Sequence, residues 1–128
     1  MVTMACHCTG CQRMSASAFS LSVAIPAQGF AVVAGEPVIG GLYGPTKHYF
    51  CPYCMSWMFT RPEGMDWFVN VRSTMLDDPG KLAPFVETYV EDKLTFAETG
   101  AVHSYGKLPP LEAWEGLMKE YAAWTAAQ

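Results

Sequence analysis

The chain has 128 residues, of which 51% are hydrophobic and 16% charged, and its formal net charge is −4. This composition predicts a globular protein and excludes a disordered one. The acidic balance and the absence of a Lys/Arg cluster argue against nucleic acid as a partner. No signal peptide and no apolar run of about 18 residues is found, so we expect a cytoplasmic protein with no membrane partner.

In chain order, the sequence predicts short strands that alternate or carry apolar runs and end at Gly or Pro. They are expected at residues 1–5, 19–25, 30–33, 38–43, 47–50, 56–60, 65–72, 85–90 and 94–97. One helical turn is expected over residues 12–17. In the strand over 65–72, Trp67, Val69 and Val71 share one face. Strands this short, with turns this frequent, predict a mainly antiparallel β domain.

The end of the chain differs, because apolar residues recur there at helical spacing. They are Leu111, Trp114, Leu117, Met118, Tyr121 and Trp124. We predict a helix over residues 110–128, with Pro110 at its first position. Its apolar stripe is expected to pack on the sheet, with a homodimer contact as the alternative. The chain is thus predicted to be one domain, 1–128, with a β-rich core over 1–109.

Three of the five cysteines lie in Cys6-His7-Cys8-Thr9-Gly10-Cys11, and the other two form Cys51-Pro52-Tyr53-Cys54. Two C-x-x-C pairs are typical of a zinc site. Disulfides fit poorly, because the number of cysteines is odd and nothing marks the chain as secreted. On an extended segment Cys6 and Cys8 share one face, and His7 points to the other.

The spacing allows two sets of ligands. In one, Cys8, Cys11, Cys51 and Cys54 close a single four-sulfur structural site. In the other, Cys6 joins Cys8 and Cys11 on an ion whose fourth position is open, as in a catalytic site. Spacing alone favours the closed site, because closed sites are the more common, and leaves the open site as the alternative.

Several stretches together resemble one family. They are the segment from Ala5 to Arg13, Ser17-Ala18-Phe19, Gly35-Glu36-Pro37, Phe50-Cys51-Pro52-Tyr53-Cys54 and the segment from Asn70 to Pro79. Their order and approximate spacing are similar to those of the glutathione-dependent formaldehyde-activating enzymes, a family that includes the centromere protein V domain. The resemblance covers residues 3–109.

This resemblance implies a β-rich, Mss4-like fold built around zinc. It implies that Cys6, Cys8 and Cys11 hold the catalytic zinc, which reverses the preference drawn from spacing. Cys51 and Cys54 would be half of a structural zinc site. The implied reaction joins glutathione to formaldehyde, giving S-hydroxymethylglutathione, and is of the carbon–sulfur lyase type. The alternative is a zinc-stabilised module without turnover that binds a protein or nucleic acid.

The chain departs from the family pattern in two places. The usual first segment, G-x-C-x-C-G, supplies the other structural zinc ligands and is not in this sequence. We expect either a truncated start or a half-site, in which Cys51 and Cys54 are empty thiols, take a substitute ligand such as His48, or recruit another chain. The second departure is Met55, where the family commonly has glycine after the second C-x-x-C.

Other polar residues are candidates for the site. Arg13 and, more weakly, Lys47 could bind a glutathione carboxylate, although each is more often a solvated charge. His7 could shuttle a proton, but a supporting or surface role fits its face better. Near the end, His103, Tyr105 and Lys107 could line a pocket, although such residues more often do not.

Overall fold

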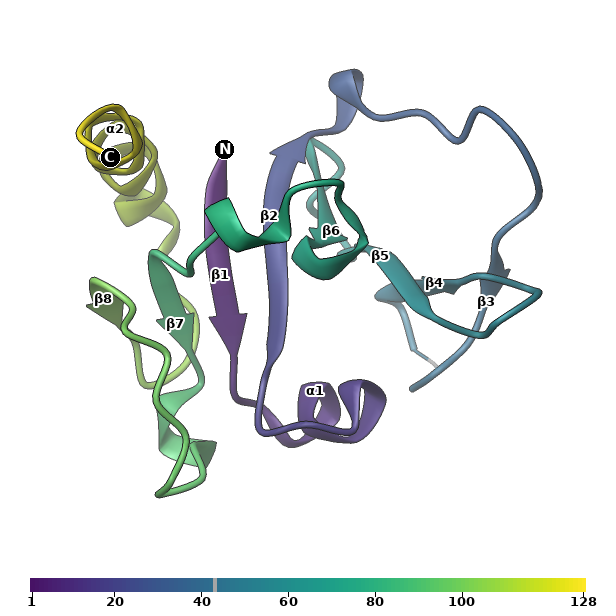
Figure 1. The fold of residues 1–128 in the computed structure, drawn as a ribbon, viewed down its shortest axis with the longest axis horizontal. Coiled ribbons are helices and arrows are strands. Elements are labelled where there is room, and N and C mark those ends of the chain that lie inside the picture. Colours follow the sequence, from purple (N-terminus) through teal and green to yellow (C-terminus); the bar gives the residue numbers. More distant parts are fainter. Residues whose placement is uncertain (43) are drawn as a thin grey trace.

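The computed structural model describes residues 1–42 and 44–128, and within them eight strands form one sheet (Figure 1). The strands are β1 (Val2–Cys6), β2 (Ser20–Pro26), β3 (Val38–Ile39), β4 (Lys47–Phe50), β5 (Trp57–Arg61), β6 (Phe68–Arg72), β7 (Val86–Thr88) and β8 (His103–Ser104). The α-helices are α1 (Thr9–Ser15) and α2 (Trp114–Ala126). Five 3-10 turns are η1 (Ala27–Gly29), η2 (Ser73–Met75), η3 (Pro79–Lys81), η4 (Val90–Asp92) and η5 (Leu111–Ala113).

The strand order is β3-β4-β5-β6-β2-β1-β7-β8. Pairing is antiparallel from β3 to β1, whereas β7 pairs parallel with both β1 and β8. The sheet twists strongly, so that β1 and β2 lie upright in Figure 1, in opposite directions, while β4 and β5 lie across the view. The mainly β prediction with a C-terminal helix is therefore confirmed, and the arrangement fits a Mss4-like fold, although the sheet is mixed rather than purely antiparallel.

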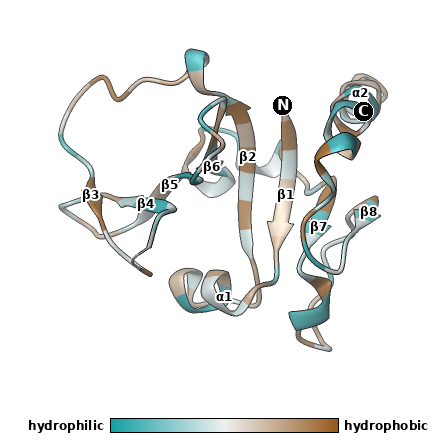
Figure 2. Cartoon of the chain, turned by 180° about the vertical axis from the view of Figure 1, so that it is seen from behind, coloured by the Kyte–Doolittle hydropathy of each residue, from teal (hydrophilic) through white to brown (hydrophobic). Residues whose placement is uncertain are grey.

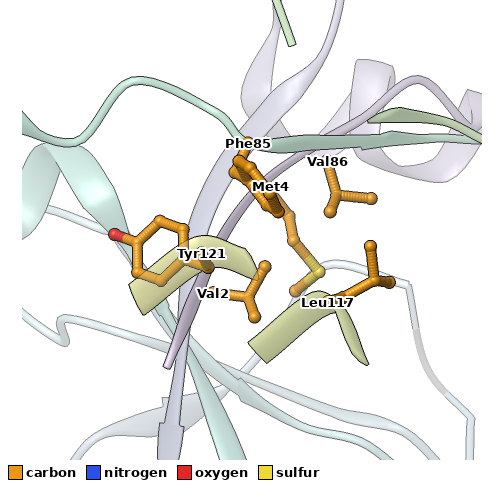
Figure 3. Packing of buried hydrophobic residues seen from close by; sticks show 6 residues of the cluster. All are labelled: Val2, Met4, Phe85, Val86, Leu117 and Tyr121. Atoms are coloured by element: carbon orange, nitrogen blue, oxygen red, sulfur yellow. The ribbon is translucent and has the colours of Figure 1, made fainter. Parts of the chain in front are cut away.

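Helix α2 covers one face of the sheet beside β1 and β7. Its buried residues, Leu117 and Tyr121, pack against Val2 and Met4 of β1 and against Val86 (Figure 3). Burial of these side chains contributes about 1.5–3 kcal/mol each. The predicted packing of the helical stripe on the sheet is confirmed for these residues. The helix itself begins at Trp114, because Leu111–Ala113 form the 3-10 turn η5.

The opposite face of the sheet carries a second cluster around Phe59, Val69 and Val71, with Phe30 packed against it. Val69 and Val71 share a face as predicted. Trp67 does not belong to that face: it is 61% exposed and lies in the turn before β6, which starts at Phe68 rather than at residue 65.

Two predicted strands are wrong. Residues 30–33 form no strand, and Val33 is 95% exposed, because no neighbouring strand pairs with this segment among the described residues. Residues 94–97 form a turn instead, closed by a hydrogen bond from the Ala97 N–H to the Leu94 carbonyl (2.9 Å). The strand predicted over 38–43 is observed only as β3, and its last residue lies outside the described residues.

The other strands are found within a few residues of their predicted bounds, and β8 had no signal of its own. Figure 2 shows the predicted alternation along β2 as brown and pale bands. Among the described residues, we find no helix with the length and apolar character needed to span a membrane.

Candidate metal centre

The three N-terminal cysteines come together where β1 meets α1. Cys6 is the last residue of β1, Cys8 is the N-cap of α1, and Cys11 lies in the first turn of that helix. Their sulfur atoms all lie within 4.8 Å of one another. Sulfurs around a tetrahedral zinc are about 3.8 Å apart for bonds of about 2.3 Å, so the three thiols fit one ion with little adjustment.

Helix α1 explains how the C-x-x-C pair converges. It begins at Thr9, earlier than the predicted turn over 12–17, so Cys8 and Cys11 are one helical turn apart and face the same side. The Cys8 sulfur accepts a hydrogen bond from the Cys11 N–H at 3.3 Å. The Ser15 hydroxyl donates to the Cys11 carbonyl at 2.7 Å, which holds the following turn.

The three thiols titrate as one group. Hydrogen bonds from Cys11 and then Cys6 lower the pKa of Cys8 to about 2. The same contacts, from Cys6 and then Cys8, raise the pKa of Cys11, and burial adds to the increase. The cluster thus gives up one proton easily and resists losing the rest, because neighbouring thiolates repel each other. A bound dication would offset that repulsion.

His7 points away from the three thiols, as the alternation along β1 predicts. It is fully buried (0% exposed), so a surface role is wrong. Its Nε2 lies 3.0 Å from Glu87 Oε2 on β7. Its carbonyl accepts a hydrogen bond from Gln12 Nε2 at 2.7 Å, and the same amide reaches the Asp92 carbonyl. The residue between two cysteines is therefore anchored directly to β7 and α1, and through Gln12 to η4.

The second cysteine pair stands apart from the first. Cys54 is exposed and its thiol donates to the Ser56 hydroxyl at 3.1 Å. Hydrogen bonds from Ser56 and from Cys51 lower the pKa of Cys54. Across residues 1–42 and 44–128, Cys6, Cys8 and Cys11 form the one group of three or more potential ligands, so neither His48 nor a carboxylate completes a cluster with Cys51 and Cys54.

Met55 ends the Cys51–Cys54 turn in the left-handed region, with φ 58. Its N–H donates to the Cys51 carbonyl at 2.8 Å. Glycine occupies this region without a steric penalty. The glycine common at this position in the family that the sequence resembles therefore has a backbone reason, and Met55 retains the conformation.

Three residues near the thiols had no signal as site residues in the sequence. Ser20 pairs with Cys6 in the β1–β2 register, and its hydroxyl lowers the Cys11 pKa, which the other thiols raise. Arg72, at the end of β6, has a pKa that burial lowers and that the charges of Cys11 and Cys6 raise in part. Tyr89 has a raised pKa, first because of burial and then because of the charges of all three thiols.

The other predicted residues lie elsewhere. Arg13 is exposed on α1, and Lys47 is exposed and donates to the Gly44 carbonyl at 2.8 Å. His48 is a strand residue whose Nδ1 lies 3.0 Å from Thr60 Oγ1. The remaining three have separate partners: His103 contacts Glu120 (2.8 Å), Lys107 contacts Glu91 (3.8 Å) and Tyr105 packs on the α2 core.

Two of the cavities among the described residues bear on the site. The larger, about 450 Å³, is apolar, lies between α2 and the ends of β2 and β6, and is lined by residues such as Trp114 and Met118. The smaller, about 350 Å³, is lined by Ser20, Trp57 and Arg72 among others, and Ser20 is the register partner of Cys6. The smaller cavity has polar lining residues and lies on the side of the cysteine cluster, so it is the better candidate to hold a substrate of that cluster.

Together, a mixed β-sheet, a covering helix and three converging thiols define a small β protein with a cysteine cluster that could hold a metal ion. No curated protein matches the chain. The family model described as glutathione-dependent formaldehyde-activating enzyme matches residues 1–92. The chain belongs to this family, which confirms the resemblance drawn from its motifs.

Proposed function

We propose that this chain is a zinc-dependent enzyme of the carbon–sulfur lyase type. It would join glutathione to formaldehyde, or a related thiol to a small aldehyde. The observation that carries the proposal is the set of three sulfurs within 4.8 Å of one another, with no fourth cysteine, histidine or carboxylate joining them among the described residues. A metal held by three protein ligands keeps a position for a substrate.

The donor set fits zinc. Thiolates are soft ligands that favour this ion, and Cys6, Cys8 and Cys11 would hold it. When bound, zinc lowers the pKa of an incoming thiol and polarises a carbonyl. Cys51 and Cys54 would form half of a second, structural site, which needs ligands from outside the described residues.

In the overall reaction a sulfur–carbon bond forms and the carbonyl π bond breaks. The thiol proton ends on the oxygen, which becomes the hydroxyl group of the adduct, so atoms and charge balance. Tyr89 is the candidate to bind this oxygen, because its phenol lies close enough to the thiols for their charges to act on it. Its left-handed backbone (φ 55) is the kind of strain that occurs at functional sites.

The test combines metal content with turnover. Zinc per chain is measured by elemental analysis for the wild type, for Cys6→Ser and for the exposed control Cys54→Ser. Exchange spectroscopy with ¹³C-formaldehyde and glutathione then measures adduct formation above the uncatalysed rate. We expect Cys6→Ser to lose both the metal of this site and the activity, and Cys54→Ser to keep the activity.

If Cys54→Ser removes all metal while Cys6→Ser changes nothing, a single closed site replaces the proposal. A metal-loaded wild type without any acceleration would favour the alternative, a zinc-stabilised module that binds a partner. The cytoplasmic location stays a prediction and agrees with the reduced thiols that this chemistry needs. A homodimer likewise stays a prediction.

A further inference from the structure

The smaller cavity is lined by serine residues that neighbour both groups of cysteines. Ser15 bonds the Cys11 carbonyl, and Ser20 is the register partner of Cys6. On the other side, Ser56 accepts the hydrogen bond from Cys54. The volume of about 350 Å³ is within the range of small-molecule sites. The cavity is lined by these serines and not by the cysteines themselves, so a molecule in it would lie near the proposed zinc ligands, with the serines between.

Arg72 lines the cavity as a buried cation that lacks a carboxylate. It is 7% exposed, and its guanidinium lies 4.0 Å from the centre of the Trp57 ring. Its Nε has no partner, and its hydrogen bond to the Asn70 carbonyl is long, 3.5 Å. Among residues 1–42 and 44–128 no aspartate or glutamate lies within 4.0 Å of it. A buried charge left in this state is costly unless something pairs with it.

Ser20 adds a second buried polar group to the same wall. It is 3% exposed, and apart from its influence on the nearby Cys11 thiol its hydroxyl makes no hydrogen bond of standard geometry. In the β2–β6 register Arg72 lies opposite Ser22, so Arg72 and Ser20 share a sheet face one diagonal step apart, about 7–8 Å between Cα atoms. A cation and a hydroxyl at this separation can bind the same small anionic group.

We propose that this cavity binds a carboxylate of the thiol substrate, with Arg72 as the cationic partner and Ser20 as a hydroxyl donor. The proposal rests on the proposed function and names its substrate class: thiols that carry a carboxylate within reach of the sulfur, as peptides such as glutathione do. Guanidinium and carboxylate form paired hydrogen bonds that fix orientation as well as adding affinity. This places the recognition of the substrate on β6, not on Arg13 or Lys47.

A rival role for Arg72 is to balance the charge of the three thiolates. The charges of Cys11 and Cys6 do raise its pKa, although burial outweighs them and lowers it to about 10, so the group stays charged at neutral pH. However, β6 is separated from β1 by β2, so the strands that carry Arg72 and Cys6 are about 10 Å apart. Charge balance predicts weaker metal binding without Arg72, whereas carboxylate recognition predicts weaker binding of acidic thiols only.

The experiment uses cobalt-substituted protein, whose thiolate charge-transfer band reports binding of a thiol. Glutathione and its diethyl ester are titrated into the wild type, Arg72→Met and Arg61→Met. Arg61 is the matched control, because it also lies over aromatic rings (5.4 Å from Phe30) but is exposed. We expect Arg72→Met to weaken the affinity for glutathione by about 10- to 100-fold, which corresponds to losing a charged hydrogen-bonded pair. The affinity for the diethyl ester should change less than twofold.

Two further measurements separate this proposal from the proposed function. S-methylglutathione, which has carboxylates but no free thiol, is titrated calorimetrically into zinc-loaded protein, and chelator competition measures zinc affinity. Failure of the wild type to bind S-methylglutathione, or equal binding by Arg72→Met, overturns the carboxylate site. Loss of zinc affinity in Arg72→Met supports charge balance and also overturns it.

If S-methylglutathione binds through Arg72 but no thiol alters the cobalt spectrum, the carboxylate site stands and the proposed function fails. Arg72→Lys keeps the positive charge if the methionine variant does not fold. It is expected to bind glutathione more weakly than the wild type, because lysine lacks the planar guanidinium that pairs with a carboxylate through two hydrogen bonds. Its affinity for the ester should equal that of the wild type.

Discussion

Replacing Glu87 by glutamine should destabilise the metal-free protein by about 2–3 kcal/mol at pH 7. Glu87 lies on β7, is 6% exposed, and links His7 to the rest of the fold. Four side chains donate to its carboxylate at 2.7–3.4 Å. These donors are Ser104, Thr99, His7 and Lys93. Glutamine keeps the shape but removes the charge that these donors surround.

The magnitude follows from the pKa. Burial raises the pKa of Glu87, but the four donors outweigh burial and lower the pKa from 4.5 to about 2. One unit corresponds to about 1.4 kcal/mol, so the shift is equivalent to about 3 kcal/mol, part of which the glutamine amide recovers by hydrogen bonding. Because the folded pKa lies below the unfolded one, this stabilisation is complete above pH 4.5 and disappears as the pH falls through about 2.

The assay is urea unfolding in the presence of a chelator, followed by circular dichroism from pH 7 to pH 2.5. The control is Glu91→Gln, which removes the same charge from a carboxylate whose side chain is 53% exposed, and which should change stability by less than about 0.5 kcal/mol. The reasoning is refuted if Glu87→Gln matches the control at pH 7. It is equally refuted if the difference between wild type and Glu87→Gln does not shrink in acid.

Three further outcomes are expected. Met55→Gly should stabilise the protein by about 0.5–1 kcal/mol, because a left-handed non-glycine residue costs about 1–2 kcal/mol. The gain is smaller than this cost, because glycine loses more backbone entropy on folding. A urea midpoint equal to or lower than that of the wild type would contradict this expectation. Leu117→Ala, at a side chain 3% exposed, should cost about 2–5 kcal/mol, whereas the neighbouring Met118→Ala, 44% exposed, should cost much less; similar losses in thermal unfolding would show that α2 is not packed as described. Adding zinc to metal-free protein should release protons and bind more weakly at pH 5 than at pH 8, as measured by calorimetry in two buffers, and pH-independent affinity would argue against thiolate ligands.

The metal turn could be predicted from the sequence because its ligands are close neighbours in the chain. Cys6 and Cys8 share a face of an extended segment, and a C-x-x-C spacing spans one turn, so local geometry alone brings these thiols together. The start of α1 at Thr9 was not foreseen, because Cys8 is not a common N-cap residue. Spacing alone favours the closed four-sulfur site, because it cannot show where Cys51 and Cys54 lie, which depends on the place of β4 in the sheet.

The surroundings of the site could not be predicted, because they depend on strand register. Ser20 and Arg72 reach the site only through the pairing of β2 with β1 and β6, and no short-range pattern encodes those pairings. The alternation along β2 even suggests that its serines face solvent. In the structure Ser20 and Ser22 are buried (3% and 5% exposed) on the face that carries Cys6.

The family match ends at residue 92, yet the segment beyond it supports the metal turn. Leu117 and Tyr121 of α2 pack on Val2 and Met4, two of the residues that lead along β1 to Cys6. The direction of that strand sets where Cys6 ends and where the turn to Cys8 begins. Because the odd residues of the same segment face the other way, His7 is anchored to Glu87 on the far side of the sheet. Strand β1 and the residue after it are thus held by α2 on one face of the sheet and by Glu87 of β7 on the other. The position of the three thiols therefore depends on contacts on both faces of the sheet.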